Sequence, residues 1–142
     1  MPARRTHAAL ALIAVTTVGI LWRYAPLHLP RFAWKYGGSM LWAVAVYCLC
    51  ATILPRTSAR RLALLSAAIA LAVEFSRLMA WPPLDAFRHT LAGKLLLGAI
   101  FSPHNIAAYW LGILLAAMID ARHALPADEK PRLGAGSRHS VS

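Results

Sequence analysis

The residues best suited to chemistry lie in one segment, residues 73–90, which reads VEFSRLMAWPPLDAFRHT. It places Glu74 and Arg77 inside a long apolar run and Asp85, Arg88 and His89 just beyond a Pro-Pro turn. An ionisable group in a membrane-spanning helix costs about 2.5–3.5 kcal/mol on insertion scales, so such a group marks a candidate functional site. Arginine suits phosphate because its planar fork donates two parallel hydrogen bonds. The segment is therefore a candidate site, and binding of an anion is one hypothesis for what it does.

Two interpretations of these charges fit the residue types. Glu74 and Arg77 are three positions apart and share one face of a helix, so they can form a structural ion pair that fixes helix contacts. Alternatively, the basic side chains receive an anionic lipid head group near the outer face and the acidic ones orient them. The ligand-binding residues of this second hypothesis are Glu74, Arg77, Asp85, Arg88 and Lys94.

Other kinds of chemistry have less support in the sequence. No His-x-x-x-His or Cys-x-x-Cys spacing, P-loop or dinucleotide motif occurs, so we expect no metal and no cofactor. Cys48 and Cys50 point to nearly opposite sides of a helix, so they cannot form a disulfide with each other. We expect both to be small buried side chains. A membrane enzyme acting on a lipid-linked substrate, with Glu74 or Asp85 as the base, lacks a recognisable nucleophile. We therefore predict a non-enzymatic role and no catalytic residues.

The composition indicates an integral membrane protein. Of the 142 residues, 59% are hydrophobic and 14% are charged, whereas a soluble domain carries about 25% charged residues. The mean hydropathy is +0.56. The net charge of +10 does not indicate nucleic-acid binding, because the basic residues lie between and beyond the apolar runs, as orientation in a membrane requires, and form no continuous basic stripe. The predicted partners are membrane lipids, with a lipid-linked anionic ligand or another membrane protein as further candidates.

The apolar runs predict an all-α, polytopic membrane helix bundle. Pro26 and Pro30 place a connection at residues 23–38, and Pro82 and Pro83 end the third span. Asp85 is expected to cap a further helix at residues 86–101 and Asn105 to cap the last span. Small residues four apart predict close helix contacts at Ala68/Ala72 and at Gly112/Ala116. The four predicted spans cover residues 8–22, 39–54, 62–81 and 106–119.

The number of spans depends on residues 86–101, which reach about 24 Å as a helix, just short of the roughly 30 Å hydrocarbon core. As a short re-entrant or interfacial helix, this segment gives four spans and places both termini on one side. As a crossing helix, it gives five. We favour four spans, because the side of the termini then holds the larger share of the basic residues, which favours a cytoplasmic N-terminus. The predicted domains are a transmembrane domain at 1–120 and a disordered cytoplasmic tail at 121–142. The basic residues on the side of the two termini are Arg4, Arg5, Arg56, Arg60, Arg61, Arg122, Lys130, Arg132 and Arg138.

Four motifs, at residues 38–43, 73–78, 83–90 and 93–98, resemble a family of small bacterial inner-membrane proteins of unknown function. That family is in turn distantly similar to the VanZ-like proteins, which are associated with the cell envelope and with glycopeptide (teicoplanin) resistance. The resemblance covers most of residues 23–120 and implies a multi-pass protein of the bacterial inner membrane. The family pattern has Asp at the position of Ser39, Gln at Arg77 and Asp at Asn105. These differences make the predicted site more cationic than the pattern implies.

Overall fold

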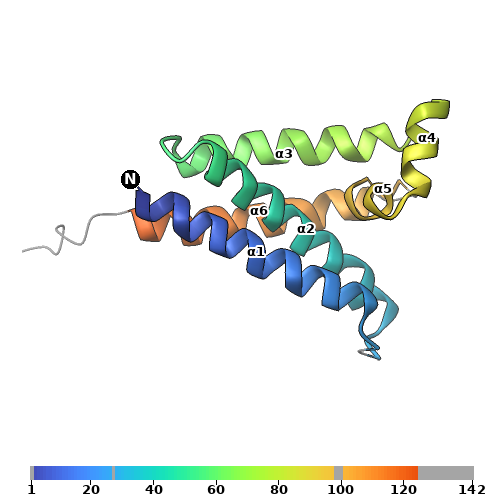
Figure 1. Cartoon of the computed structure of the whole chain (residues 1–142), viewed down its shortest axis with the longest axis horizontal. Helices are drawn as coiled ribbons and strands as arrows, with labels where there is room; N and C mark the ends of the chain where they lie inside the picture. Colours follow the sequence, from blue (N-terminus) through green and yellow to red (C-terminus); the bar gives the residue numbers. More distant parts are fainter. Residues whose placement is uncertain (1, 27, 98–100, 125–142) are drawn as a thin grey trace, which may run out of the picture.

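The regular elements in the described part of this computed structural model, residues 2–26, 28–97 and 101–124, are all helices. The long helices are α1 (Pro2–Tyr24), α2 (Arg31–Ile53), α3 (Ala59–Ser76) and α6 (Pro103–Ala124), and the short ones are α4 (Pro82–His89) and α5 (Leu91–Leu96). The long helices run up and down beside one another, and the short helices lie at the end of the bundle where α3 ends and α6 begins (Figure 1). The predicted all-α class is therefore confirmed.

Three of these helices are long and apolar enough to cross a membrane, namely Ala3–Tyr24, Arg31–Ile53 and Pro103–His123. Their outer faces carry many exposed large apolar side chains, such as Ile13 on α1 and Leu114 on α6, at 64% and 56% exposure. Such faces are typical of a protein embedded in lipid. The third helix in sequence, α3, is apolar over most of its length but includes Arg60, Arg61 and Glu74.

Two predicted boundaries are wrong at the edges of α2 and α3. The expected connection at residues 23–38 is shorter, because α2 begins at Arg31, directly after Pro30. Proline is tolerated at a helix start, where its missing N–H has no intrahelical partner in any case. The third span was expected to reach residue 81, but α3 ends at Ser76 with Arg77 as its C-cap. The chain leaves the helix through tight turns, in which Leu78 N–H donates to the Phe75 carbonyl at 3.0 Å.

The expected single helix at residues 86–101 is two short helices, and residues 98–100 lie outside the described part. Helix α4 begins at Pro82 with Trp81 as its N-cap, so Asp85 lies in the first turn and does not cap the helix. Thr90 separates α4 from α5, and its hydroxyl accepts a hydrogen bond from Gly93 N–H at 3.0 Å. A helix-capping threonine of this kind starts a new helix in a new direction.

The last helix is longer at both ends than predicted. Because α6 begins at Pro103, Asn105 lies within its first turn and is not the cap. Because α6 runs to Ala124, residues 121–124 of the predicted disordered tail are helical. The rest of that tail lies outside the described residues.

The core lies where α2, α3 and α6 meet. Tyr47 on α2 and Tyr109 on α6 are among its largest side chains, and Cys48 and Cys50 are buried as free thiols. The predicted close contact at Gly112 is confirmed, because a Cβ there would lie 2.7 Å from the Met40 carbonyl oxygen of α2. The predicted contact at Ala68 and Ala72 is wrong within this chain, because both residues are exposed.

Candidate functional site

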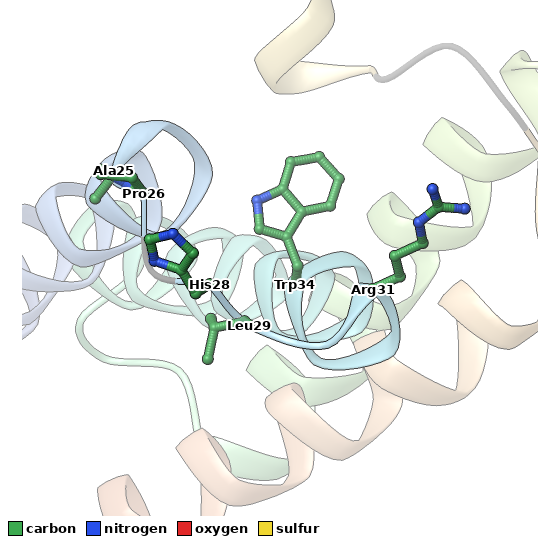
Figure 2. Close-up of a pocket in the computed structure, with 6 residues that line it drawn as sticks. All are labelled: Ala25, Pro26, His28, Leu29, Arg31 and Trp34. Atoms are coloured by element: carbon green, nitrogen blue, oxygen red, sulfur yellow. The ribbon is translucent and has the colours of Figure 1, made fainter.

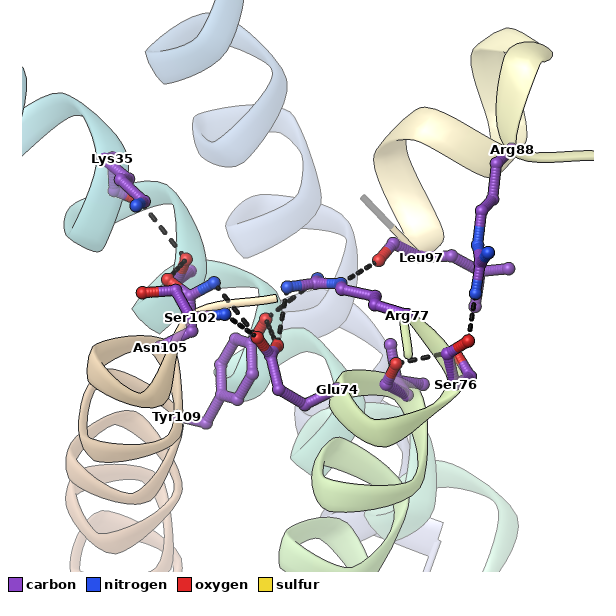
Figure 3. Close-up of polar contacts among 11 residues, drawn as sticks. Lys35, Glu74, Ser76, Arg77, Arg88, Leu97, Ser102, Asn105 and Tyr109 are labelled. Carbon is purple, nitrogen blue, oxygen red and sulfur yellow. Dashed lines mark hydrogen bonds and ion pairs between the residues drawn. The ribbon is translucent and has the colours of Figure 1, made fainter. Parts of the chain in front are cut away.

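The Glu74 carboxylate is completely buried in the last turn of α3 and faces the start of α6 (Figure 3). Its Oε2 accepts hydrogen bonds from Arg77 Nη1 at 2.6 Å and from the Tyr109 hydroxyl at 3.0 Å. Its Oε1 accepts from the Ser102 backbone N–H at 2.7 Å and from the Asn105 side-chain amide at 3.5 Å. A buried charge is costly unless it is paired and hydrogen-bonded, and these donors meet both conditions.

Arg77 connects the end of α3 to the segment that leads into α6. Its Nε donates to the Leu97 carbonyl, and its Nη2 donates to the Tyr109 hydroxyl at 3.1 Å. The side chain of Arg77 is only 8% exposed. These contacts favour the structural interpretation for the Glu74–Arg77 pair, because the guanidinium donates hydrogen bonds to groups of the protein itself.

The polar group around Glu74 extends to α2 through Ser39, whose hydroxyl donates to the Asn105 side-chain oxygen at 3.2 Å. Ser39, Arg77 and Asn105 are the three positions at which the resemblance implies a difference from the family pattern. All three lie in this one hydrogen-bonded group, although they are far apart in sequence. Carboxylates at positions 39 and 105 would crowd Glu74, whereas two neutral side chains and one guanidinium suit a single buried carboxylate.

An open pocket of about 370 Å³ lies outside this buried group, between the end of α3 and the α4–α5 pair. It brings together four of the five predicted ligand-binding residues, and the fifth, Glu74, lies behind Arg77 in the protein interior. We call this the basic pocket. It is lined by Arg77, Leu78, Met79, Ala80, Asp85, Arg88, His89 and Lys94.

Arg88 holds α4 against the end of α3. Its Nη1 donates to Asp85 Oδ1 at 2.7 Å and to the Met79 carbonyl at 3.2 Å, and its Nη2 donates to the Ser76 carbonyl. The last carbonyls of a helix lack intrahelical partners, so a guanidinium in this place completes their hydrogen bonding. Its Nε is buried and has no partner in the described part of the chain.

Lys94 supplies the excess positive charge of the basic pocket. Its side chain is exposed on α5, and no described residue forms a hydrogen bond or an ion pair with its ammonium group. The two arginines are each paired with a carboxylate, Arg77 with Glu74 and Arg88 with Asp85. With His89 counted as neutral, three cations against two carboxylates leave one net positive charge, which is carried by Lys94.

A second hollow, of about 290 Å³, lies at the connection between α1 and α2 (Figure 2). It is lined by Ala25, Pro26, His28, Leu29, Arg31 and Trp34. The Arg23 guanidinium lies 5.0 Å from the centre of the Trp34 ring and takes up the cation-binding face of that ring. This end of the molecule thus has the mixture of aromatic and basic residues that is typical of a membrane interface.

At the opposite end of the bundle, Arg4 forms a second polar group that the sequence analysis missed. Its Nε and Nη2 donate to the two oxygens of Asp120 at 3.1 and 2.6 Å, and its Nη1 donates to the Pro55 and Thr57 carbonyls, both at 2.8 Å. The Tyr47 hydroxyl also donates to Asp120, at 2.7 Å. The signal in the sequence was a single acidic residue at the end of one apolar run and a basic residue at the start of another. We call this group the Arg4 latch.

Exchange of Arg4 for methionine is expected to lower the free energy of unfolding by about 1–3 kcal/mol, because Asp120 and two carbonyls lose charge-assisted hydrogen bonds. Thermal unfolding of the purified protein in detergent measures this effect. Arg5→Met is the matched control, because Arg5 is the next residue on α1 and is exposed. Equal effects of the two exchanges would show that the Arg4 latch does not stabilise the bundle.

Among the described residues, no group of three His, Cys, Asp or Glu side chains could hold a metal ion. The fold and the two polar groups define a small helical membrane protein with a buried ion pair and a basic pocket at one end of its bundle. Residues 28–113 match the model of a family described as "Protein of unknown function (DUF2809)", and the chain belongs to this family. The matched residues include the whole Glu74 group and the basic pocket. No curated protein and no solved structure matches the chain.

Proposed function

We propose that this protein is a non-enzymatic protein of the bacterial inner membrane that binds an anionic lipid, or a lipid-linked head group, in the basic pocket. The observation that carries the proposal is Lys94, an exposed cation without a protein partner in the described chain, beside two arginines in one pocket. The sequence places these charges at the end of an apolar helix, where a lipid head group would meet them.

The proposal includes four membrane crossings, formed by α1, α2, α3 and α6. The charges of α3 are compatible with a crossing, because Arg60 and Arg61 lie in its first turn and can extend to the membrane surface. Glu74 is buried inside the protein and does not face lipid. The contact of Arg4 with Asp120 joins the start of α1 to the end of α6, as an even number of crossings requires. Helices α4 and α5 are too short to cross and are proposed to lie in the interface.

The proposed orientation places the Arg4 latch in the cytoplasm and the basic pocket at the outer surface. The positive-inside rule supports it, because the end with the Arg4 latch also carries Arg56 in the α2–α3 connection and Arg60 and Arg61 in the first turn of α3. The distant VanZ-like resemblance supports a role at the cell envelope. Replacement of the exposed residues His89 and Arg5 by cysteine, one at a time, would test sidedness, with labelling from outside expected at position 89 alone.

Exchange of Lys94 for glutamine tests the proposed function. We expect about tenfold weaker retention of phosphatidylglycerol by the purified protein, corresponding to the loss of one charge-assisted contact of about 1.4 kcal/mol. Native mass spectrometry of protein released from lipid nanodiscs measures the retained lipid. The control is Lys35→Gln, which removes an exposed lysine that does not line the pocket. Unchanged retention by a folded Lys94→Gln variant would refute the proposal.

A structural or accessory role in a membrane complex is the second candidate, favoured by one specific observation. Most donors of Arg77 and Arg88 are directed to groups of the chain itself, namely carboxylates, backbone carbonyls and the Tyr109 hydroxyl. In that case the charges serve packing, and the apolar outer faces bind another membrane protein. Exchange of Arg77 cannot distinguish the two functions, because it would disturb folding as well as binding. Lys94 can, since its exchange leaves the packed contacts in place.

A further inference from the structure

We infer that the ligand of the basic pocket is the head group of a phosphodiester lipid with one negative charge, and not a phosphomonoester or a diphosphate. This inference rests on the proposed function and specifies the chemical class of its ligand. It follows from the balance of charges in the pocket, from the end of α3 that forms its wall, and from the apolar residues at its rim.

The charge balance of the pocket matches a monoanion. Arg77 and Arg88 lie 2.6 and 2.7 Å from the carboxylates of Glu74 and Asp85, so each arginine is neutralised by its own pair. Of the three cations that line the pocket, Lys94 is the one without a partner among the described residues. A phosphodiester neutralises this charge. A phosphomonoester carries about −1.5 to −2 at pH 7 and would leave negative charge uncompensated in a partly desolvated site.

The end of α3 opposes a second negative charge as well. The carbonyls of Ser76 and Met79, at and just beyond the C-terminal end of this helix, accept hydrogen bonds from Arg88, and Met79 also lines the pocket. The C-terminal end of a helix carries partial negative charge. An additional charge on the ligand would therefore face both these carbonyls and the Asp85 carboxylate, which also lines the pocket.

The rim of the pocket favours a lipid over a water-soluble ester. Leu78 and Met79 line the pocket and are 61% and 60% exposed. Trp81, the N-cap of α4, is 57% exposed beside them in sequence. In the proposed orientation these apolar side chains lie at the level of the head groups, where aromatic and apolar residues contact the upper acyl chains.

A competition experiment tests the inference. The protein is placed in phosphatidylcholine nanodiscs with equal small amounts of phosphatidylglycerol, a phosphodiester, and phosphatidic acid, a phosphomonoester. We expect the lipid retained after release to contain at least threefold more phosphatidylglycerol than phosphatidic acid. Asp85→Asn raises the net charge of the pocket by one, so it should shift the preference toward phosphatidic acid. Asp85 suits this test because its side chain is 44% exposed and is not part of the buried Glu74 group.

The possible outcomes separate the inference from the proposed function. Retention of phosphatidic acid above phosphatidylglycerol would overturn the inference and leave the proposed anion site in place. Retention of neither lipid above phosphatidylcholine would refute both. If water-soluble glycerophosphoglycerol displaced phosphatidylglycerol as well as added phosphatidylglycerol does, the pocket would recognise the phosphodiester without the acyl chains. That result would overturn the inference that the ligand is a lipid. Repeating the comparison in His89→Gln, which has no imidazole in the pocket, should leave the preference for phosphatidylglycerol unchanged, and a reversal would overturn the charge argument.

Discussion

Exchange of Glu74 for glutamine is expected to lower the free energy of unfolding by about 3–5 kcal/mol, the typical cost of removing one partner from a buried ion pair. The Arg77 guanidinium, whose side chain is only 8% exposed, would lose its counter-ion. The side-chain NH2 of the new glutamine would also face groups that donate hydrogen bonds to Glu74, such as the Ser102 N–H, and two donors cannot bond to each other. Titration with SDS in detergent micelles, followed by circular dichroism, measures the change.

A double-mutant cycle shows whether this cost belongs to the pair. Arg77→Leu alone should be about as destabilising as Glu74→Gln, because it leaves the carboxylate buried without its cation. The double variant should be more stable than the sum of the single effects implies, by at least about 1 kcal/mol, since neither charge is then left alone. Asp85→Asn is the control, because the Asp85 side chain is 44% exposed and its pair with Arg88 should contribute less than the pair of the fully buried Glu74. Additive effects at Glu74 and Arg77 would contradict the structural role of the pair.

The sequence was sufficient to predict the helical membrane class and the place of the polar cluster. Composition and apolar run length determine the class, because few charged residues cannot cover a soluble domain. The spacing of Glu74 and Arg77 predicts their contact, since residues three apart on a helix are neighbours. Pro82 and Pro83 predict that the third long helix ends nearby, although α3 ends at Ser76, before the expected residue 81. These inferences use local geometry alone.

The sequence could not predict the contacts that depend on packing between distant helices. Tyr109 and Ser102 reach Glu74 only because α6 packs on α3, and their separations in sequence are 35 and 28 residues. The Arg4 latch spans 116 residues for the same reason. The split of residues 86–101 depends on the threonine cap at Thr90, which apolar periodicity does not reveal. Local patterns thus predicted where the charged residues gather, and tertiary packing determined which of these charges are buried.

The contact between α2 and α6 is the basis of the second large expected effect. Gly112→Ala should lower the free energy of unfolding by about 1–3 kcal/mol, the usual cost of overpacking a close contact. The added Cβ would lie 2.7 Å from the Met40 carbonyl oxygen and 2.9 Å from Met40 Cγ. The nearer atom belongs to the backbone, so the helices must separate and loosen the buried Tyr109 and Ile113. The measurement is the same SDS titration.

Gly38→Ala is the matched control, because it makes the same chemical change within a helix and has room for it. Its Cβ would meet Trp22 Cδ1 at 3.8 Å, an ordinary contact distance. Alanine is favoured over glycine within a helix by about 0.5–1 kcal/mol, so this variant should be as stable as the original protein or slightly more stable. The difference between the two variants therefore isolates the close approach of α2 and α6. If both variants were equally stable, α2 and α6 would not be in tight contact at Gly112. The packing of α6 on α2 would then not explain how Tyr109 on α6 is held against Glu74.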